Sequence, residues 1–262
     1  MQFLLQLQRI GKSGFLPLNY QYELSSAIYK VLEQADAEYS QFLHFEGYQY
    51  ENKHYKPFTF SLLKFDNFII HPEFNRLEHT GTNVTLDIRF AVDRAAEGFI
   101  RGLFLNQKIG LGDKLSQVDY EVVRIEAAAP VYFSDEMQYS CLSPVFLSAV
   151  RKDGGADYLS PEDERYSCVF KTNLLRRFLS FHPEVVGLKD LDSYCPEISF
   201  SLIGKPKKKG ITLKSFSEKP IKVIGYQFDF KLKASPILQE LGYYGGFGSK
   251  NAMGFGCVGV LA

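Results

Sequence analysis

Apolar side chains recur along this chain with the two periods of regular secondary structure. Within residues 3–10, Phe3, Leu5 and Leu7 fall on one face at every second position, which predicts a strand. Within residues 21–34, apolar residues recur every three to four positions, which predicts an amphipathic helix. For the first half of the chain, the pattern predicts strands over 3–10, 58–63, 83–92 and 118–126 and helices over 21–34, 36–47 and 93–106.

The second half repeats this order of elements. Ser160 followed by Pro161 is typical of a helix N-cap and predicts a helix that begins at Pro161. The pattern predicts strands over 142–151, 196–204, 222–234 and 253–261, helices over 161–181 and 235–242, and a connector over 127–139. Two βαββαβ-like halves predict an α+β protein of two tandem ferredoxin-like domains, residues 1–126 and 140–262, with antiparallel sheets.

The composition is that of an ordinary globular chain. Of its 262 residues, 45% are hydrophobic and 23% charged, which excludes disordered, collagen-like and coiled-coil proteins. The apolar runs are far shorter than the ~20 residues that span a bilayer, and residues 1–13 lack the features of a signal peptide. We therefore expect a cytoplasmic protein with no membrane contact. Aromatic residues make up 15% of the chain, which suits open sheet faces that stack on RNA bases.

Lysines are concentrated in one short segment of a chain whose net charge is zero. Residues 203–222 hold seven lysines and a single acid, Glu218. Such a local excess of positive charge indicates a binding surface for a polyanion, although a solvated hairpin tip is the simpler explanation of an isolated lysine run. We expect the segment to be the basic tip of a hairpin that contacts RNA through Lys205, Lys207, Lys208, Lys209 and Lys214.

Glycines are concentrated near the C-terminus, where two Gly-Phe-Gly triplets are separated by five residues. Glycine allows positive φ and close approach of a ligand to the backbone. The segment follows a short helix and leads into a strand, so it matches neither a P-loop nor a dinucleotide-binding loop; a flexible turn is the plainer alternative. The candidate RNA-binding residues here are Gly246, Gly248, Lys250, Gly254 and Gly256.

The doubled Gly-Phe-Gly signature resembles that of the repeat-associated RNA-binding (RAMP) superfamily of CRISPR systems. More narrowly, the chain resembles the CRISPR repeat-RNA-processing endoribonucleases, and several separated blocks carry the resemblance in the family's order. These blocks are LPLNYQYELSSAIY (16–29), FLHFEGY (42–48), KPFTFSLL (56–63), GLFLNQKI (102–109), LSPVFLSAVRK (142–152) and GYYGGFGSKNAMGFGCVGV (242–260).

Two residues in these blocks stand off the apolar stripes of their predicted helices. At 100° per residue, His44 lies about 140° from Tyr39 on the helix that begins near Asp36. Tyr29 is displaced by the same angle from Leu24 on the preceding helix. Both side chains can therefore point away from the core, although packing on the surface would also account for a lone tyrosine.

RNA cleavage without a metal needs groups that move a proton and a cation that stabilises the phosphorane. Histidine changes protonation near neutral pH, and lysine is a compact charge directed at phosphate. The resemblance implies that a tyrosine, a histidine and a lysine share these tasks, at the matching positions Tyr29, His44 and Lys56. Because extra residues separate His44 from Lys56, either Lys53 or His54 could take one of these roles.

No motif indicates a metal site or a cofactor. The histidines form no HxxxH or HExxH pattern, and the four cysteines form no CxxC pair. We expect His71 and His79 to be solvated in a loop, and Cys141, Cys168, Cys195 and Cys257 to be buried thiols.

The resemblance implies a metal-independent endoribonuclease that cuts CRISPR precursor RNA within each repeat. Attack by the 2′-hydroxyl would leave a 2′,3′-cyclic phosphate and a 5′-hydroxyl. The expected partners are CRISPR repeat RNA, as precursor and as processed guide, and other proteins of an interference complex, with the chain itself a monomer or a homodimer. The alternatives are a paralogue that binds repeat RNA without cutting it and a nucleotide-binding enzyme that uses the glycine-rich segment.

Overall fold

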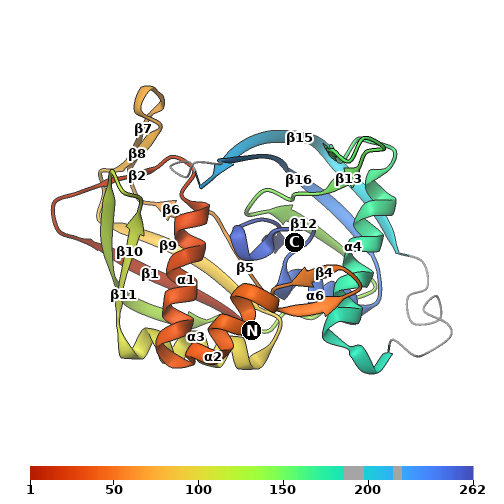
Figure 1. Ribbon diagram of the computed structural model, residues 1–262, viewed down its shortest axis with the longest axis horizontal. Helices are drawn as coiled ribbons and strands as arrows, with labels where there is room; N and C mark the ends of the chain where they lie inside the picture. Colours follow the sequence, from red (N-terminus) through yellow and green to blue (C-terminus); the bar gives the residue numbers. More distant parts are fainter. Residues whose placement is uncertain (186–197, 215–219, 262) are drawn as a thin grey trace.

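The computed structural model describes residues 1–185, 198–214 and 220–261. It contains two α+β domains side by side, each an antiparallel sheet with helices on one face (Figure 1). This confirms the predicted fold class. Within the described residues, no helix is both long and apolar enough to cross a membrane.

The N-terminal sheet has the strand order β10-β11-β1-β9-β5. Its strands are β1 (Gln2–Ile10), β5 (Phe58–Phe60), β9 (Asn83–Phe90), β10 (Lys108–Gly112) and β11 (Gln117–Ala127), with β6 (Lys64–Phe65) beside β9. With α1 (Gln21–Ala35) and α3 (Asp93–Leu105), the order is that of a ferredoxin-like domain to which β10 adds one edge strand. The two helices pack closely, since a Cβ on Gly102 of α3 would lie 1.9 Å from the Val31 carbonyl oxygen of α1.

The C-terminal sheet has the order β15-β16-β12-β17, again the ferredoxin-like arrangement. Its strands are β12 (Glu136–Cys141), β15 (Ser199–Leu213), β16 (Ile221–Lys233) and β17 (Val258–Val260), and its helices are α4 (Tyr166–Phe181) and α6 (Pro236–Gly245). Aromatic side chains fill the space between sheet and helices, as where Phe170 of α4 meets Phe230 of β16 edge to face with ring centroids 5.9 Å apart.

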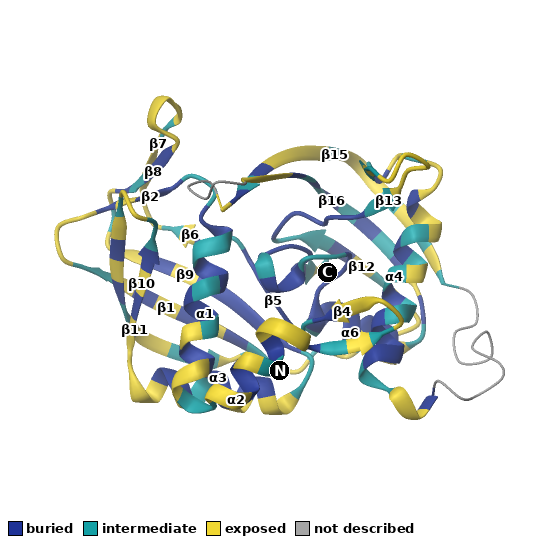
Figure 2. Cartoon of the chain, in the orientation of Figure 1, coloured by how far each residue is buried: buried dark blue, intermediate teal, exposed yellow. Residues whose placement is uncertain are grey.

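Smaller elements surround the two sheets. A three-stranded sheet combines β2 (Phe15–Pro17), β7 (Phe68–His71) and β8 (Arg76–His79), and β3 (Tyr48–Tyr50) pairs with β4 (Lys53–Tyr55). The others are α2 (Ala37–Gln41), the π-helical turn η1 (Phe42–Glu46), the 3₁₀ turns η2 (Pro72–Phe74), η3 (Pro183–Val185) and η4 (Asn251–Met253), and the pair β13 (Ser148–Val150) and β14 (Ala156–Tyr158). The apolar residues gather inside each domain, whereas the projecting β7–β8 hairpin is exposed along most of β7 and at its tip, and mostly buried along β8 (Figure 2).

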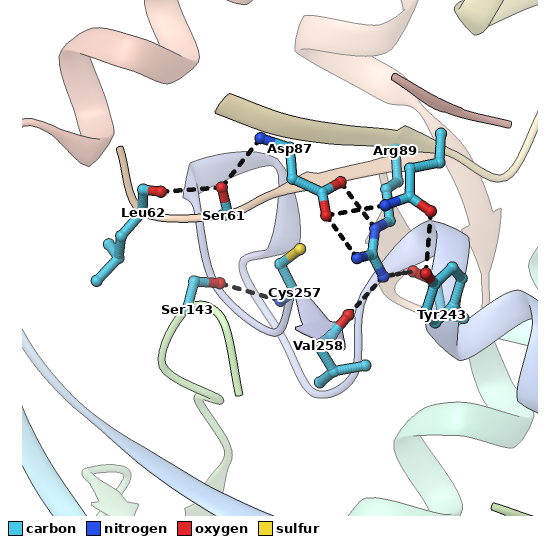
Figure 3. A network of polar contacts seen from close by, with 9 residues as sticks. Ser61, Leu62, Asp87, Arg89, Ser143, Tyr243, Cys257 and Val258 are labelled. Carbon is cyan, nitrogen blue, oxygen red and sulfur yellow. Dashed lines mark hydrogen bonds and ion pairs between the residues drawn. The ribbon is translucent and has the colours of Figure 1, made fainter. Parts of the chain in front are cut away.

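A buried polar network joins the domains around Arg89 of β9 (Figure 3). Its guanidinium donates to Asp87 at 2.7 and 3.0 Å and to the carbonyl oxygen of Val258 in the second domain at 2.5 Å. It also lies 3.9 Å from the ring centroid of Tyr243. Because a buried charge is stable only when it is paired and hydrogen-bonded, this network fixes how the two domains sit against each other.

Several predicted boundaries were wrong. Part of the segment predicted as a connector forms β12, and residues 142–147 of the predicted strand lie outside any strand. Residues 160–165 form turns, because Asp163 accepts hydrogen bonds from the main chain and side chain of Arg165, and α4 begins only at Tyr166. At the C-terminus, η4 and a loop precede the short β17.

The environment predicted for His79 was also wrong. His79 is fully buried in β8, where its Nε2 lies 2.9 Å from Asp66 and its Nδ1 lies 3.1 Å from the Tyr120 hydroxyl. His71, at the end of β7, is half-buried and lies 3.0 Å from Glu78. Cys257 is buried as expected and Cys141 partly so, whereas Cys168 is exposed; Cys195 lies outside the described residues.

Candidate active site

A cleft of about 670 Å³ lies where the two domains meet. Its walls come from α1, η1, the β3–β4 hairpin, α4, β16 and the glycine-rich loop, residues 246–256. Four lysine or arginine side chains and two histidines line it: His44, Lys53, His54, Lys56, Arg177 and Lys250. None of the described lining residues is an aspartate or glutamate. Such a concave, acid-free and basic surface favours a polyanion.

The three predicted catalytic side chains line this one cleft. The rings of Tyr29 and His44 meet edge to face with centroids 5.3 Å apart. The Nζ of Lys56 donates to the main-chain carbonyl of His44 at 3.2 Å. A phenol, an imidazole and an ammonium thus lie in the same part of the cleft.

Local sequence features place His44. Asp36 caps α2, as expected, by accepting a hydrogen bond from the Tyr39 main-chain nitrogen at 2.9 Å. Tyr39 and Leu43 are buried and anchor the segment, which leaves His44 exposed on the opposite side. The turn ends at Gly47, where φ is 66° and a Cβ would lie 2.9 Å from the Lys56 Nζ. Glycine at this position therefore leaves the space that Lys56 occupies.

Burial changes the ionisation of two of these groups. It lowers the pKa of the Lys56 ammonium to about 8, because desolvation penalises the charged form more than nearby Glu46 favours it. It raises the pKa of the half-buried Tyr29 phenol. At neutral pH, Lys56 is therefore mainly cationic, whereas Tyr29 keeps its proton and can donate it in a hydrogen bond.

Lys53 and His54, the alternative candidates, line the same cleft from β4. The Nδ1 of His54 lies 2.7 Å from the Glu46 carbonyl oxygen. A carbonyl only accepts, so Nδ1 carries the proton in this hydrogen bond. Lys53 and His54 therefore stay alternative candidates for the roles assigned to Lys56 and His44.

The candidate glycines of the loop are buried and have positive φ, from 75° at Gly248 to 86° at Gly246. Protein atoms already occupy the space that a side chain would need. A Cβ on Gly248 would lie 2.7 Å from the Phe146 carbonyl oxygen, and one on Gly256 would lie 1.9 Å from that of Phe247. These glycines therefore let the loop fold tightly on the protein, while partly buried Lys250 lines the cleft. Contact of the loop with RNA stays a prediction.

The lysine-rich segment is part of a strand, not the hairpin tip that we expected. Lys205, Lys207, Lys208 and Lys209 are exposed within β15, an edge strand, and Lys214 follows its end. Part of the tip, residues 215–219, lies outside the described residues and includes Glu218 and Lys219. The Lys214 ammonium lies 5.5 Å from the ring of Tyr22, which lines the cleft. The basic strand therefore leads toward the cleft.

Sequence reasoning missed Arg177, which is 1% exposed and lies behind the glycine-rich loop. It also missed Tyr22 and Tyr158, aromatic residues of the cleft wall. A signal for Arg177 was present, since it continues the apolar stripe of α4 that contains Phe170, Leu174 and Phe178. A charged residue on a buried stripe indicates a specific partner inside the fold.

Comparisons with known proteins cover nearly the whole chain. The family model described as "CRISPR-associated protein Cas6, N-terminal" matches residues 15–126, and "CRISPR associated protein Cas6, C-terminal" matches residues 127–260. A Methanocaldococcus jannaschii protein named CRISPR-associated endoribonuclease Cas6 1 is 30% identical over 246 residues, 93% of this chain and 86% of the relative. A Pyrococcus furiosus protein named CRISPR-associated endoribonuclease Cas6 is 28% identical over 264 residues, 99% of this chain and 90% of the relative.

The fold is shared with a solved structure described as "An RAMP protein binding different RNA substrates". The two have a TM-score of 0.78 and 21% sequence identity, and the match covers 100% of each chain. At this identity the likeness shows the architecture, two ferredoxin-like domains in tandem.

Proposed function

This chain belongs to the Cas6 family of CRISPR-associated proteins, and we propose that it cuts CRISPR precursor RNA within each repeat to release guide RNAs. The observation that carries this proposal is the cleft itself, where Tyr29, His44 and Lys56 come together on a basic surface whose described lining residues include no aspartate or glutamate. The relatives named as endoribonucleases support the reaction class.

The reaction that suits these groups is internal transesterification. The ribose 2′-oxygen forms a bond to the adjacent phosphorus, the bond from phosphorus to the 5′-oxygen breaks, and the products are a 2′,3′-cyclic phosphate and a 5′-hydroxyl. One proton leaves the 2′-hydroxyl and one reaches the departing 5′-oxygen. His44 serves one of these transfers, because an imidazole can accept or donate a proton near neutral pH. This chemistry needs no metal ion.

The other two residues act on the phosphate. Lys56 is mainly cationic at neutral pH, and its ammonium stabilises the charge that accumulates on the phosphorane. Tyr29 keeps its proton at neutral pH, as a phenol ordinarily does, and burial raises its pKa further. It donates a hydrogen bond that orients the reacting group. The edge-to-face contact with Tyr29 also holds the His44 ring in place.

The RNA strand extends from the cleft along β15, where exposed lysines meet its phosphates. The glycine-rich loop contributes Lys250 at the cleft, and its four glycines act by giving the loop its shape. The processed guide RNA passes to other proteins of a CRISPR interference complex in the cytoplasm.

Incubation of the purified protein with synthetic repeat RNA in EDTA tests the proposal. We expect cleavage at one position, with a 5′-hydroxyl that polynucleotide kinase labels without prior phosphatase treatment and a 3′ end that is cyclic or its hydrolysed form. A shift of the RNA in a gel without any cleavage would instead identify a repeat-RNA-binding paralogue. Cleavage that appears only with a divalent metal would overturn the mechanism.

A further inference from the structure

Arg177 of α4 holds the glycine-rich loop from behind. Its Nη1 donates to the carbonyl oxygen of Gly245 at 3.2 Å and to that of Gly246. Its Nη2 donates to the carbonyl oxygen of Gly248 and to the side-chain oxygen of Asn251. One planar guanidinium therefore binds the loop both where it begins, at Gly245 and Gly246, and further along, at Gly248 and Asn251. The fixed arrangement of its N–H donors makes this possible.

Asn251 extends this arrangement to the second half of the loop. Its side-chain nitrogen donates to the carbonyl oxygens of Phe247 at 3.1 Å and Phe255 at 3.0 Å. One turn before Arg177, Asn173 of α4 donates to the Ser249 hydroxyl at 3.0 Å. Side-chain hydrogen bonds from Asn173 and Arg177 therefore tie the loop that carries Lys250 to α4.

The same helix contacts the part of the cleft that bears the candidate catalytic lysine. The Arg177 guanidinium carbon lies 5.7 Å from the ring centroid of Tyr55, which is buried and immediately precedes Lys56. Arg176 forms an ion pair with Glu51 at 3.0 Å, at the turn between β3 and β4. Arg177 therefore lies between the loop of the C-terminal domain and the strand that leads to Lys56.

Arg177 also brings a positive charge into the protein without a matching acid. Within the described residues, its hydrogen-bond partners are three carbonyls and one amide oxygen, and none is a carboxylate. Burial lowers the pKa of the guanidinium to about 10, so the group remains charged at neutral pH. A buried cation without a carboxylate is costly, and this one lines a cleft that we assign to RNA.

We propose that Arg177 is a positioning residue for RNA: it sets the glycine-rich loop, and with it Lys250, opposite Lys56, and its charge favours the phosphate backbone in the cleft. This proposal rests on the proposed function but concerns binding of the RNA rather than proton transfer. Tyr29, His44 and Lys56 all belong to the N-terminal domain, whereas Arg177 belongs to the C-terminal domain. Loss of Arg177 should therefore lower the affinity for RNA more than it slows the chemical step.

The test uses single-turnover cleavage of labelled repeat RNA over a series of protein concentrations. It yields the rate at saturation and the protein concentration that gives half of that rate. For Arg177→Gln we expect the half-saturating concentration to rise by about ten-fold or more, because the released loop no longer holds Lys250 at the phosphate and one charge-assisted contact is worth roughly that ratio. The saturated rate should stay within about three-fold. Arg177→Lys, which keeps the charge but not the fork, should show a smaller rise.

Arg176→Gln is the matched control, because Arg176 is a neighbouring arginine whose ion pair with Glu51 is exposed. Its half-saturating concentration should stay within about two-fold of wild type, as exposed ion pairs contribute little. A purely structural role for Arg177 would lower the melting temperature and the active fraction, yet leave the half-saturating concentration of the folded Arg177→Gln protein unchanged. That result would overturn the proposal.

Two further readouts keep the test decisive. If Arg177→Gln does not fold, Arg177→Lys decides: a rise of about three-fold or more with a retained saturated rate supports the proposal, and a wild-type value overturns it. If the wild-type protein binds repeat RNA but does not cut it, the proposed function fails separately. In that case the equilibrium dissociation constants of the same variants, measured by fluorescence anisotropy, test Arg177 with the same expected ratios.

Discussion

Replacement of His44 by alanine separates the proposed chemistry from folding. The side chain is exposed, and its ring contacts are the edge-to-face approaches to Tyr29 at 5.3 Å and Phe45 at 4.7 Å. Such contacts are worth roughly 0.5–1.5 kcal/mol each, and exposure reduces this further. The hydrogen bond from Lys56 is made to the His44 main chain and survives the substitution. The melting temperature should therefore fall by less than about 5 °C.

The effect on cleavage should be much larger. Removal of a group that transfers a proton in the transition state lowers the rate by roughly 10²–10⁴, which corresponds to about 2.7–5.4 kcal/mol. This rise in the activation free energy is larger than the loss of folding free energy expected from either ring contact. Affinity for RNA should change by less than about three-fold, because the imidazole acts on the barrier and not on the ground state.

The assay is single-turnover cleavage of repeat RNA in EDTA with saturating protein, and binding is measured by anisotropy. His54→Ala is the matched control, since His54 lines the same cleft and contacts a main-chain oxygen at 2.7 Å. Its rate should stay within about five-fold of wild type, as loss of one exposed hydrogen bond costs about 1 kcal/mol or less.

Two results would refute the reasoning about His44. If His54→Ala is inactive and His44→Ala cuts normally, the active-site histidine has been assigned to the wrong position. If both variants cut normally and EDTA stops the wild-type reaction, general acid–base catalysis by these residues is wrong.

Three other variants test charge and backbone geometry. Because the pKa of Lys56 is lowered to about 8, its positive charge is lost as the pH rises through 8; the cleavage rate should fall above pH 8, and Lys56→Arg should remove that fall, so an unchanged alkaline limb would contradict the role. Alanine at residues 207–209 should reduce the log–log salt slope of RNA binding by about 0.7 per contact, roughly two in all; an unchanged slope would mean that the strand is merely solvated. Gly248→Val should destabilise the protein by at least about 2 kcal/mol, because φ is 75° and a Cβ would lie 2.7 Å from a carbonyl oxygen. Thermal unfolding checks this against Gly210→Ala, whose Cβ would meet nothing within 4 Å, and equal stability of the two variants would disprove it.

Periodicity located the elements that bury one face, such as α1 and α3, but not those that lack such a face. β15 extends nine residues beyond the predicted strand. Its lysine-rich part shows no alternation of apolar and polar residues that would predict a strand, and its pairing with β16 holds it in one. Ser160 and Pro161 have the appearance of a helix start, yet contacts between Asp163 and Arg165 keep the segment in turns. In both segments, contacts with residues that the local pattern does not identify outweighed the local structural preference.

His79 and Arg177 show the same limit for polar residues. Burial of His79 depends on Asp66, thirteen residues away, and on Tyr120, forty-one residues away. Burial of Arg177 depends on loop carbonyls about seventy residues later in the chain. Polar residues are usually exposed, so only the positions of its partners distinguish His79 from a surface residue. The place of Arg177 on the apolar stripe of α4 indicates burial but does not identify the carbonyls that it binds.

The sequence by itself determined the α+β class and the two ferredoxin-like halves. It also showed that Tyr29 and His44 stand off the apolar stripes of their helices, because such displacement is a local geometric property. The family resemblance gave catalytic roles to Tyr29, His44 and Lys56. Only the tertiary structure decided that these three side chains share a cleft with Lys250, since the cleft forms where two domains meet. It also decided the role of the loop glycines, because whether a glycine faces a ligand or the protein depends on which atoms pack against it, and those atoms come from elsewhere in the chain.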